Sequence, residues 1–186
     1  MLSHEQISKA ERIHKELGSL LEKHFTEMSE HVTDVNYSWI DQTTFGEYVK
    51  SLSSRCHSYT YDLVPMDMPA TMDFALPVRN YILKLNGIER SDPLALVTDE
   101  ERSVMTKYAT RALADQEAAW GPVEKVRVRD ATIEQNKSEL SIAQTGDTIL
   151  LVGYECHMQH ANGIIRFAYP LSTLAPILGK LDSWTP

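Results

Sequence analysis

Two helix-start signals, roughly a hundred residues apart, most constrain how this chain can fold. Ser3 with Gln6, and Thr98 with Glu101, each give a capping box. In that pattern a hydroxyl accepts from the third helical amide, and the later side chain reaches back to the cap amide. Behind each box, apolar residues recur at helical spacing, and a Gly-Pro pair after Trp120 ends the second run. The sequence therefore predicts two long, capped helices.

The segments after the two helices follow in the same order, so the chain contains two copies of one unit. Each helix leads into a strand with a Val-x-x-Val pattern, a short helical piece, and then a strand that carries a Cys-His pair. A further strand, a proline and a short apolar helix complete each copy. The paired positions are Val32–Val35 and Val123–Val126, residues 46–49 and 138–141, Cys56-His57 and Cys156-His157, and Pro65 and Pro170.

This repeat predicts an α+β domain with pseudo-two-fold symmetry. Two helix-strand-strand-strand-helix units, at about residues 3–87 and 98–182, would join their half-sheets into one continuous sheet flanked by the long helices. Units of this length exceed the period of solenoid repeats. We expect a single domain over residues 1–182, with residues 183–186 as a tail or the start of a linker.

Local patterns give finer predictions within this domain. Valines from Val123 to Val128, with basic residues between the later ones, predict a half-buried strand directly after the second long helix. Asn162-Gly163 predicts a two-residue hairpin turn, because both turn positions need positive φ. Residues 172–181 predict one short closing helix. Asn86-Gly87 predicts the C-terminal cap of a helix over residues 78–85.

Charge and composition exclude several classes of function. The net charge of -8 argues against nucleic acid as a partner, since phosphate binding requires a basic surface. No apolar run approaches the roughly 20 residues that span a bilayer, so no insertion into the membrane is expected. Two cysteines are too few for a disulfide framework, which favours a reducing, cytoplasmic location.

The two Cys-His pairs are the first candidates for a chemical site. Cys56, His57, Cys156 and His157 could supply four zinc ligands if the pseudo-two-fold axis brought them together. Neighbouring residues on a strand, however, point to opposite faces. We therefore expect each pair to be a buried cysteine beside a surface histidine.

The histidines along the first helix are the second candidates. His14, His24 and His31 accompany a mostly aliphatic stripe, and we expect partly buried helix residues there instead of metal ligands. The chain also lacks the dinucleotide, P-loop, nucleophile-elbow and HExxH motifs. The prediction is that no residue serves a catalytic, cofactor-binding or metal-binding role.

Taken in order, these segments resemble the middle domain of the flagellar motor switch protein FliM, which shares one pseudo-symmetric fold with the chemotaxis phosphatases CheC and CheX. The resemblance covers about residues 5–182. Lys137 departs from it, because proline is usual there. The matching pieces are Thr44–Tyr48 with Ser51-Leu52, Met72–Phe74, Asn86-Gly87, Thr98–Trp120 with Val123 and Val126, Glu134–Asn136, Asn162-Gly163 through Leu171, and Ala175-Pro176.

The resemblance implies a non-enzymatic scaffold of the motor switch, or C-ring, which takes part in switching the direction of rotation in chemotaxis. It places the protein in the cytoplasm, at the flagellar basal body on the inner face of the cell membrane. The implied partners are the rotor protein FliG and neighbouring FliM-like copies, which pack through the long helices. The family's FliG-binding Gly-Gly-x-Gly loop corresponds to Asn86, Gly87, Ile88 and Glu89 here.

The alternative within the same fold is a CheC/CheX-type phosphatase of phosphorylated CheY. Those relatives carry Glu-x-x-Asn on the long helices, and neither predicted long helix contains it. Glu134 and Asn136 have a different spacing and lie at a strand end. Phosphorylated CheY is also a candidate partner, because Leu2-Ser3 and Ile7 resemble the family's N-terminal CheY-binding peptide. Helix capping by Ser3 is the competing interpretation of that segment.

Overall fold

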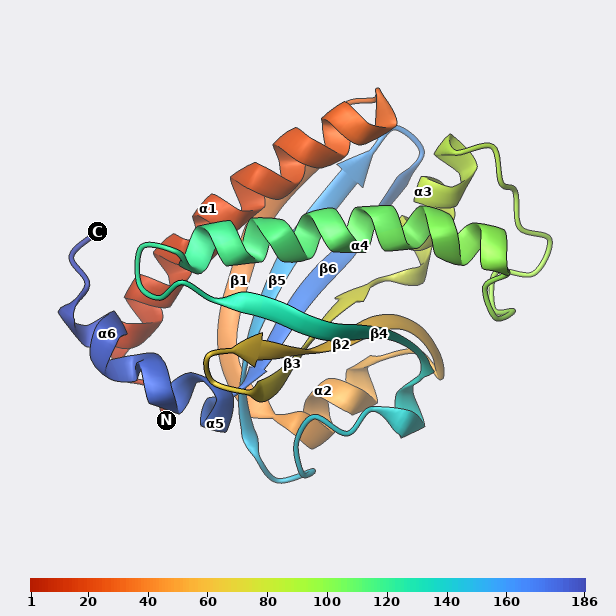
Figure 1. The fold of residues 1–186 in the computed structure, drawn as a ribbon. Coiled ribbons are helices and arrows are strands. Elements are labelled where there is room, and N and C mark those ends of the chain that lie inside the picture. Colours follow the sequence, from red (N-terminus) through yellow and green to blue (C-terminus); the bar gives the residue numbers. More distant parts are fainter.

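The computed structural model describes residues 1–186, as two successive sets of helices and strands that share one sheet (Figure 1). The first set comprises α1 (His4–Ser29), β1 (Asp34–Thr44), α2 (Phe45–Ser51), β2 (Arg55–Val64), β3 (Met68–Phe74) and α3 (Leu76–Leu85). The second comprises α4 (Asp99–Trp120), β4 (Arg127–Asn136), the 3-10 turn η1 (Lys137–Glu139), β5 (Thr148–Met158), β6 (Ala161–Pro170), α5 (Leu171–Leu174), the 3-10 turn η2 (Ala175–Ile177) and α6 (Leu178–Ser183).

Both capping boxes form and start the two long helices. The Ser3 hydroxyl accepts from the Gln6 amide at 3.1 Å, and the Thr98 hydroxyl accepts from the Glu101 amide at 3.2 Å. In each box the later side chain accepts from the cap amide, at 2.9 Å and 3.1 Å. These bonds satisfy amides that a helix N-terminus otherwise leaves unpaired.

The sheet joins the two sets by exchanging one strand each. Its order is β1-β5-β6-β3-β2-β4, and every pair is antiparallel. β1 pairs with β5 of the second set, and β4 pairs with β2 of the first. β3 and β6 meet in the middle, where Asp73 lies opposite Arg166. The order reads the same from either edge when the two sets are exchanged, which confirms the predicted pseudo-two-fold α+β domain.

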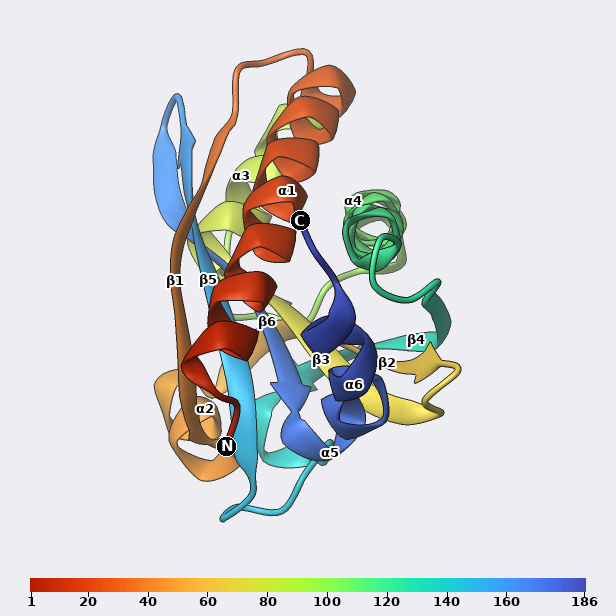
Figure 2. The same cartoon turned by 90° about the vertical axis from the view of Figure 1, so that its left-hand side faces the viewer.

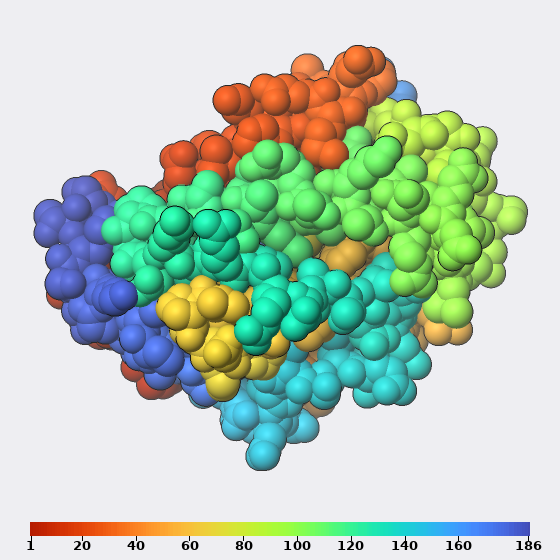
Figure 3. Space-filling view, viewed as in Figure 1, coloured from red at the N-terminus to blue at the C-terminus, as the bar shows by residue number.

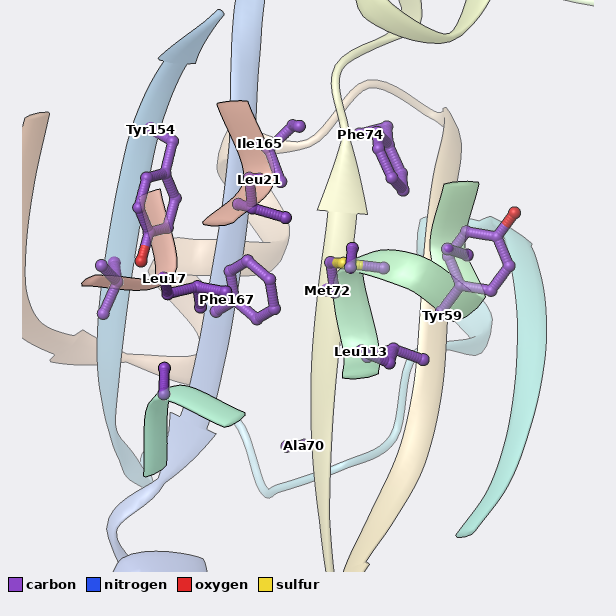
Figure 4. Packing of buried hydrophobic residues seen from close by; sticks show 14 of the residues in the cluster. Leu17, Leu21, Tyr59, Ala70, Met72, Phe74, Leu113, Tyr154, Ile165 and Phe167 are labelled. Carbon is purple, nitrogen blue, oxygen red and sulfur yellow. The ribbon is translucent and has the colours of Figure 1, made fainter. Parts of the chain in front are cut away.

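The helices cover both faces of the sheet. On β5, Leu150 and Val152 belong to the core beneath α1, α3 and α4, whereas Ile149 and Leu151 belong to a smaller core with α2. Neighbouring strand residues face opposite sides, so the two long helices and α2 lie on opposite faces. Figure 2 shows α1 and α4 on the same side of the sheet. Figure 4 shows the larger core, in which the labelled side chains are Leu17, Leu21, Tyr59, Ala70, Met72, Phe74, Leu113, Tyr154, Ile165 and Phe167.

Buried polar contacts also link α1, α4 and β6. The Tyr169 hydroxyl accepts from Gln116 Nε2 at 2.6 Å and from Trp120 Nε1 at 3.4 Å. His14 Nε2 lies 3.0 Å from the same oxygen. All four side chains are buried. A buried hydroxyl with several partners fixes how the elements pack, because losing one partner would leave a polar group unsatisfied.

The predicted hairpin turn at Asn162-Gly163 is wrong. Both residues lie within β6, where Asn162 pairs with His157 and Gly163 pairs with Cys156. Neither has positive φ. The glycine serves a different purpose, because a Cβ at position 163 would lie 2.6 Å from Val78 Cγ2. Helix α3 therefore packs against β6 at a distance that only glycine allows.

Two other predicted boundaries also differ. β4 begins at Arg127, because the amides of Val123 and Glu124 still donate to the Trp120 carbonyl and continue the turn after α4. The predicted single closing helix is divided into α5, η2 and α6. Pro176 lies in η2 and has no amide to donate to the preceding turn, which interrupts the α-helix.

The end of the chain stays in contact with the fold. Ser183 is the last residue of α6, and Trp184 packs against the larger core. The Trp184 amide donates to the Lys180 carbonyl at 3.0 Å.

Candidate partner-binding loop between α3 and α4

The residues that the resemblance implies for partner binding lie where α3 ends. The Ile88 amide donates to the Leu83 carbonyl, and the Gly87 amide donates to the Lys84 carbonyl, both at 3.0 Å. This pair of bonds is the Schellman motif, which requires a left-handed residue after the helix cap. Gly87 supplies it with a φ of 79°. The predicted C-cap at Asn86-Gly87 is thus confirmed.

The four residues differ in what they expose. Asn86, Gly87 and Glu89 are exposed, whereas Ile88 is half-buried and packs against the larger core. The Asn86 amide group donates to the Ile82 carbonyl at 2.8 Å. Ile88 therefore anchors the segment, and its exposed surface is mainly backbone and polar side chain.

Two arginines, buried Arg79 and Arg90 with its enclosed side chain, bind the rest of the loop from its inner side. Arg79 of α3 donates through Nη2 to the Pro93 carbonyl at 2.7 Å. Arg90 lies within the loop itself and donates to three more of its carbonyl groups. The acceptors of Arg90 are the carbonyl oxygens of Asp92 (from Nε, 3.3 Å), Ala95 and Leu96 (from Nη2, 3.5 Å for Leu96). Carbonyl groups along the loop thus face inward.

The far end of the loop is fixed to α4 and β4. Arg90 forms an ion pair with Glu101, the same residue that completes the capping box with Thr98. The Val97 amide donates to Gln135 Oε1 at 2.9 Å, and the Val97 side chain is buried. Contacts from three different elements therefore set the shape of a segment that has no regular secondary structure.

The outer face of the loop presents two leucines. Leu94 and Leu96 are 55% and 54% exposed. Sequence reasoning did not single them out, because a leucine in a loop points into the core as readily as outward. The available signal was the pair of leucines flanking Ala95 in an otherwise polar segment.

Two titratable side chains beneath the loop, Arg79 and His57, have lowered pKa values. Burial and then the charge of Arg90 lower the pKa of Arg79 to about 10. His57 Nε2 lies 2.8 Å from the Tyr59 hydroxyl. Burial, followed by the charges of nearby arginines led by Arg79, lowers the pKa of His57 to about 3. Neither pKa lies near neutral pH, where a general acid or base works best.

The Cys-His pairs are not brought together as one site. Cys156 is buried and His157 is exposed, as predicted, and Cys56 is buried as well. The prediction of a surface histidine is wrong for His57, which is fully buried and packs edge-on against Phe74. An irregularity in the pairing of β2 with β4, next to His57, accompanies this difference. No group of His, Cys, Asp and Glu side chains has an arrangement that could hold a metal ion.

The histidines of the first helical segment have separate environments. His14 is fully buried, and burial lowers its pKa to about 4. His24 is partly buried, with Nδ1 2.8 Å from Asp115 Oδ1 on α4. The prediction of a partly buried helix residue is wrong for His31, which is exposed and lies beyond the end of α1.

The residues weighed for phosphatase chemistry are engaged locally. Glu134 Oε1 accepts from the amides of Gln135 at 3.0 Å and of Asn136 at 2.9 Å. The Asn136 side chain accepts from the Ser138 hydroxyl at 3.0 Å and caps η1. These contacts make both side chains part of a turn at the end of β4.

The N-terminal Leu-Ser segment packs onto the fold. Leu2 is buried, and its amide donates to Gln42 Oε1 at 2.7 Å. Ser3 caps α1. The structure thus supports the capping interpretation of this segment. Separately, none of the helices combines the length and the apolar composition needed to cross a bilayer.

Comparison with known proteins gives one family. The family model described as flagellar motor switch protein FliM matches residues 3–185. The FliM of Borreliella burgdorferi is 25% identical over 187 residues, which cover 97% of this chain and 53% of that protein. The chain thus spans about half the length of the curated relatives it matches.

Solved structures show the same fold. FliM in the crystal structure of the FliM–SpeE complex from H. pylori has a TM-score of 0.92 at 18% identity, covering 99% of this chain and 98% of that chain. The FliG–FliM complex from H. pylori gives a TM-score of 0.85 at 18% identity, covering 96% of this chain and 100% of that chain. With a family match over nearly its whole length, the chain belongs to the family of the flagellar motor switch protein FliM.

Proposed function

We propose that this chain is a non-enzymatic scaffold of the flagellar motor switch, located in the cytoplasm at the flagellar basal body. The observation that carries the proposal is the family match over residues 3–185, combined with an exposed loop whose backbone is bound by Arg79 and Arg90. In this role the chain takes part in switching the direction of rotation during chemotaxis.

The proposed contact with the rotor protein FliG is the loop between α3 and α4. Asn86, Gly87, Ile88 and Glu89 stand where the family has Gly-Gly-x-Gly. The Schellman turn and the hydrogen bonds from Arg79 and Arg90 support this assignment, because a loop that is already ordered loses little conformational entropy on binding. The solved FliG–FliM complex from H. pylori contains a chain with this fold.

Neighbouring FliM-like copies are the second proposed partners. The outer face of α4 is available for such a contact, because Ser103, Thr106, Lys107 and Thr110 are all exposed along it. Ser103, Thr106 and Thr110 have short polar side chains, which allow another surface to approach the helix closely.

Two measurements test this function. Calorimetric titration of the chain with FliG from the same organism should give saturable binding, and a folded sample that shows none would overturn the FliG assignment. Addition of the chain to phosphorylated CheY should leave its rate of dephosphorylation unchanged. A clear acceleration would instead establish the phosphatase alternative.

A further inference from the structure

Exposed large apolar side chains are rare in this protein and two of them share one loop. The exposed ones are Met1, Met28, Val32, Leu94 and Leu96. Leu94 and Leu96 are separated by one residue at the outer end of the molecule, where the loop protrudes beside α3 and the start of α4 (Figure 1). Neighbouring exposed apolar residues mark interaction sites more often than single ones do.

The outward direction of these leucines follows from contacts beneath them. Arg79 and Arg90 bind the carbonyl groups of residues 92, 93, 95 and 96. With those carbonyl groups directed inward, Leu94 and Leu96 are left on the solvent side. The Leu94 amide also donates to Asp92 Oδ1 at 2.9 Å. The leucines are therefore displayed by an ordered backbone and do not depend on a flexible tip.

Exposed acidic residues lie on both sides of the two leucines along the chain. Asp92 precedes them, and Asp99 and Glu100 follow in the first turn of α4; all three are exposed. The loop forms part of the right-hand margin of the space-filling view (Figure 3). A partner that matches this surface needs an apolar depression bordered by basic side chains.

By contrast, residues 86–89 offer little apolar surface. Ile88 packs inward, Gly87 has no side chain, and the Asn86 amide group is bonded to the helix end. Glu89 lies 3.9 Å from Lys84, so its charge is already partly paired. These four residues are better suited to setting the direction of the loop than to supplying most of the binding energy.

We propose that, in this chain, the contact with the rotor protein is centred on Leu94 and Leu96 with an acidic rim of Asp92, Asp99 and Glu100. This inference rests on the proposed function, since it assigns the residues of that same contact. The partner surface is an apolar socket on FliG with basic side chains around it. Association is faster at low ionic strength, because the rim attracts that basic border.

The test is a titration of FliG from the same organism with four forms of the full chain. The double variant Leu94→Ser/Leu96→Ser should weaken binding by about tenfold or more, as central apolar anchors do. The matched control is Val32→Ser, an exposed apolar residue in the α1–β1 turn, and it should bind as the unaltered chain does. The fourth form, Asn86→Ala/Glu89→Ala, should change the affinity less than the leucine variant does.

The outcomes separate this inference from the function on which it rests. If the unaltered chain does not bind FliG, both fail. If it binds, and the leucine variant binds with the same affinity, the inference alone fails, whatever the affinity of the Asn86/Glu89 variant. Circular dichroism and thermal unfolding of each variant establish that the fold is intact. The acidic rim is tested with Asp99→Asn/Glu100→Gln, which should lower the association rate and its dependence on salt; an unchanged salt dependence contradicts the rim.

Discussion

Arg90 and Glu101 form an ion pair in which both side chains are enclosed, with exposed fractions of 5% and 9%. Arg90 belongs to the loop between α3 and α4, and Glu101 completes the capping box that starts α4. One carboxylate thus serves the helix start and the loop at once. The pair explains how an irregular segment can keep one shape at the edge of the molecule.

Replacing Arg90 by alanine should destabilise the fold by about 3–5 kcal/mol, because it leaves the Glu101 carboxylate buried without its cation. The exposed Arg102 on the same helix gives the matched control, and Arg102→Ala should cost about 0.5 kcal/mol or less. Urea unfolding followed by circular dichroism measures both. Equal losses of unfolding free energy in the two variants would show that the buried ion pair stabilises the fold no more than an exposed arginine does.

Gly163→Ala should destabilise the protein by about 1–3 kcal/mol, since the new Cβ would lie 2.6 Å from Val78 Cγ2 in a packed core. The added variant Val78→Ala removes that methyl group, so the double variant should lose less stability than the two single losses combined. Gly146→Ala is the control, because no atom lies within 4 Å of its added Cβ. Strict additivity at positions 78 and 163 would argue against the steric explanation.

Gly163 also shows where sequence reasoning about this fold succeeds and fails. Capping boxes act through neighbours in the chain, so Ser3 and Thr98 could be identified correctly from the sequence. Asn162-Gly163 has the composition of a hairpin turn, yet the demand for glycine comes from Val78, which is distant in the sequence. Local patterns cannot reveal a requirement that arises only when α3 packs on β6.

The candidate site shows the same division. The Schellman turn at Gly87 was predictable, because its hydrogen bonds join residues of one helix end. The exposure of Leu94 and Leu96 was not predictable, because the shape of their loop depends on Arg79 of α3 and on Glu101 of α4. The repeat likewise predicted two half-sheets, but the exchange of β1 and β4 between them is a pairing that element order alone does not specify.

Stability should fall as the pH is lowered from about 6.5 towards 4, because the unfolded chain then binds protons that buried His14 and His57 do not. Their folded-state pKa values of about 4 and about 3 lie below the unfolded value, so each histidine lowers stability by about 2 kcal/mol at pH 5 relative to pH 8. Urea unfolding at both pH values measures the difference. His14→Gln should reduce it by about 2 kcal/mol, whereas the exposed His4→Gln should leave it unchanged; equal pH dependence in the two variants would contradict the assignment.

The two long helices should also be coupled through Asp115, which is fully buried on α4. Its Oδ1 accepts from Arg111 Nη2 at 2.9 Å and lies 2.8 Å from His24 Nδ1 on α1. Asp115→Ala should cost about 1.5–3 kcal/mol, the range for hydrogen bonds to a charged group, while Thr110→Ala on the exposed face of α4 should cost about 0.5 kcal/mol or less. A double-mutant cycle with His24→Ala should give a coupling energy of about 1 kcal/mol between α1 and α4. A coupling of zero would mean that apolar packing alone holds the two helices together.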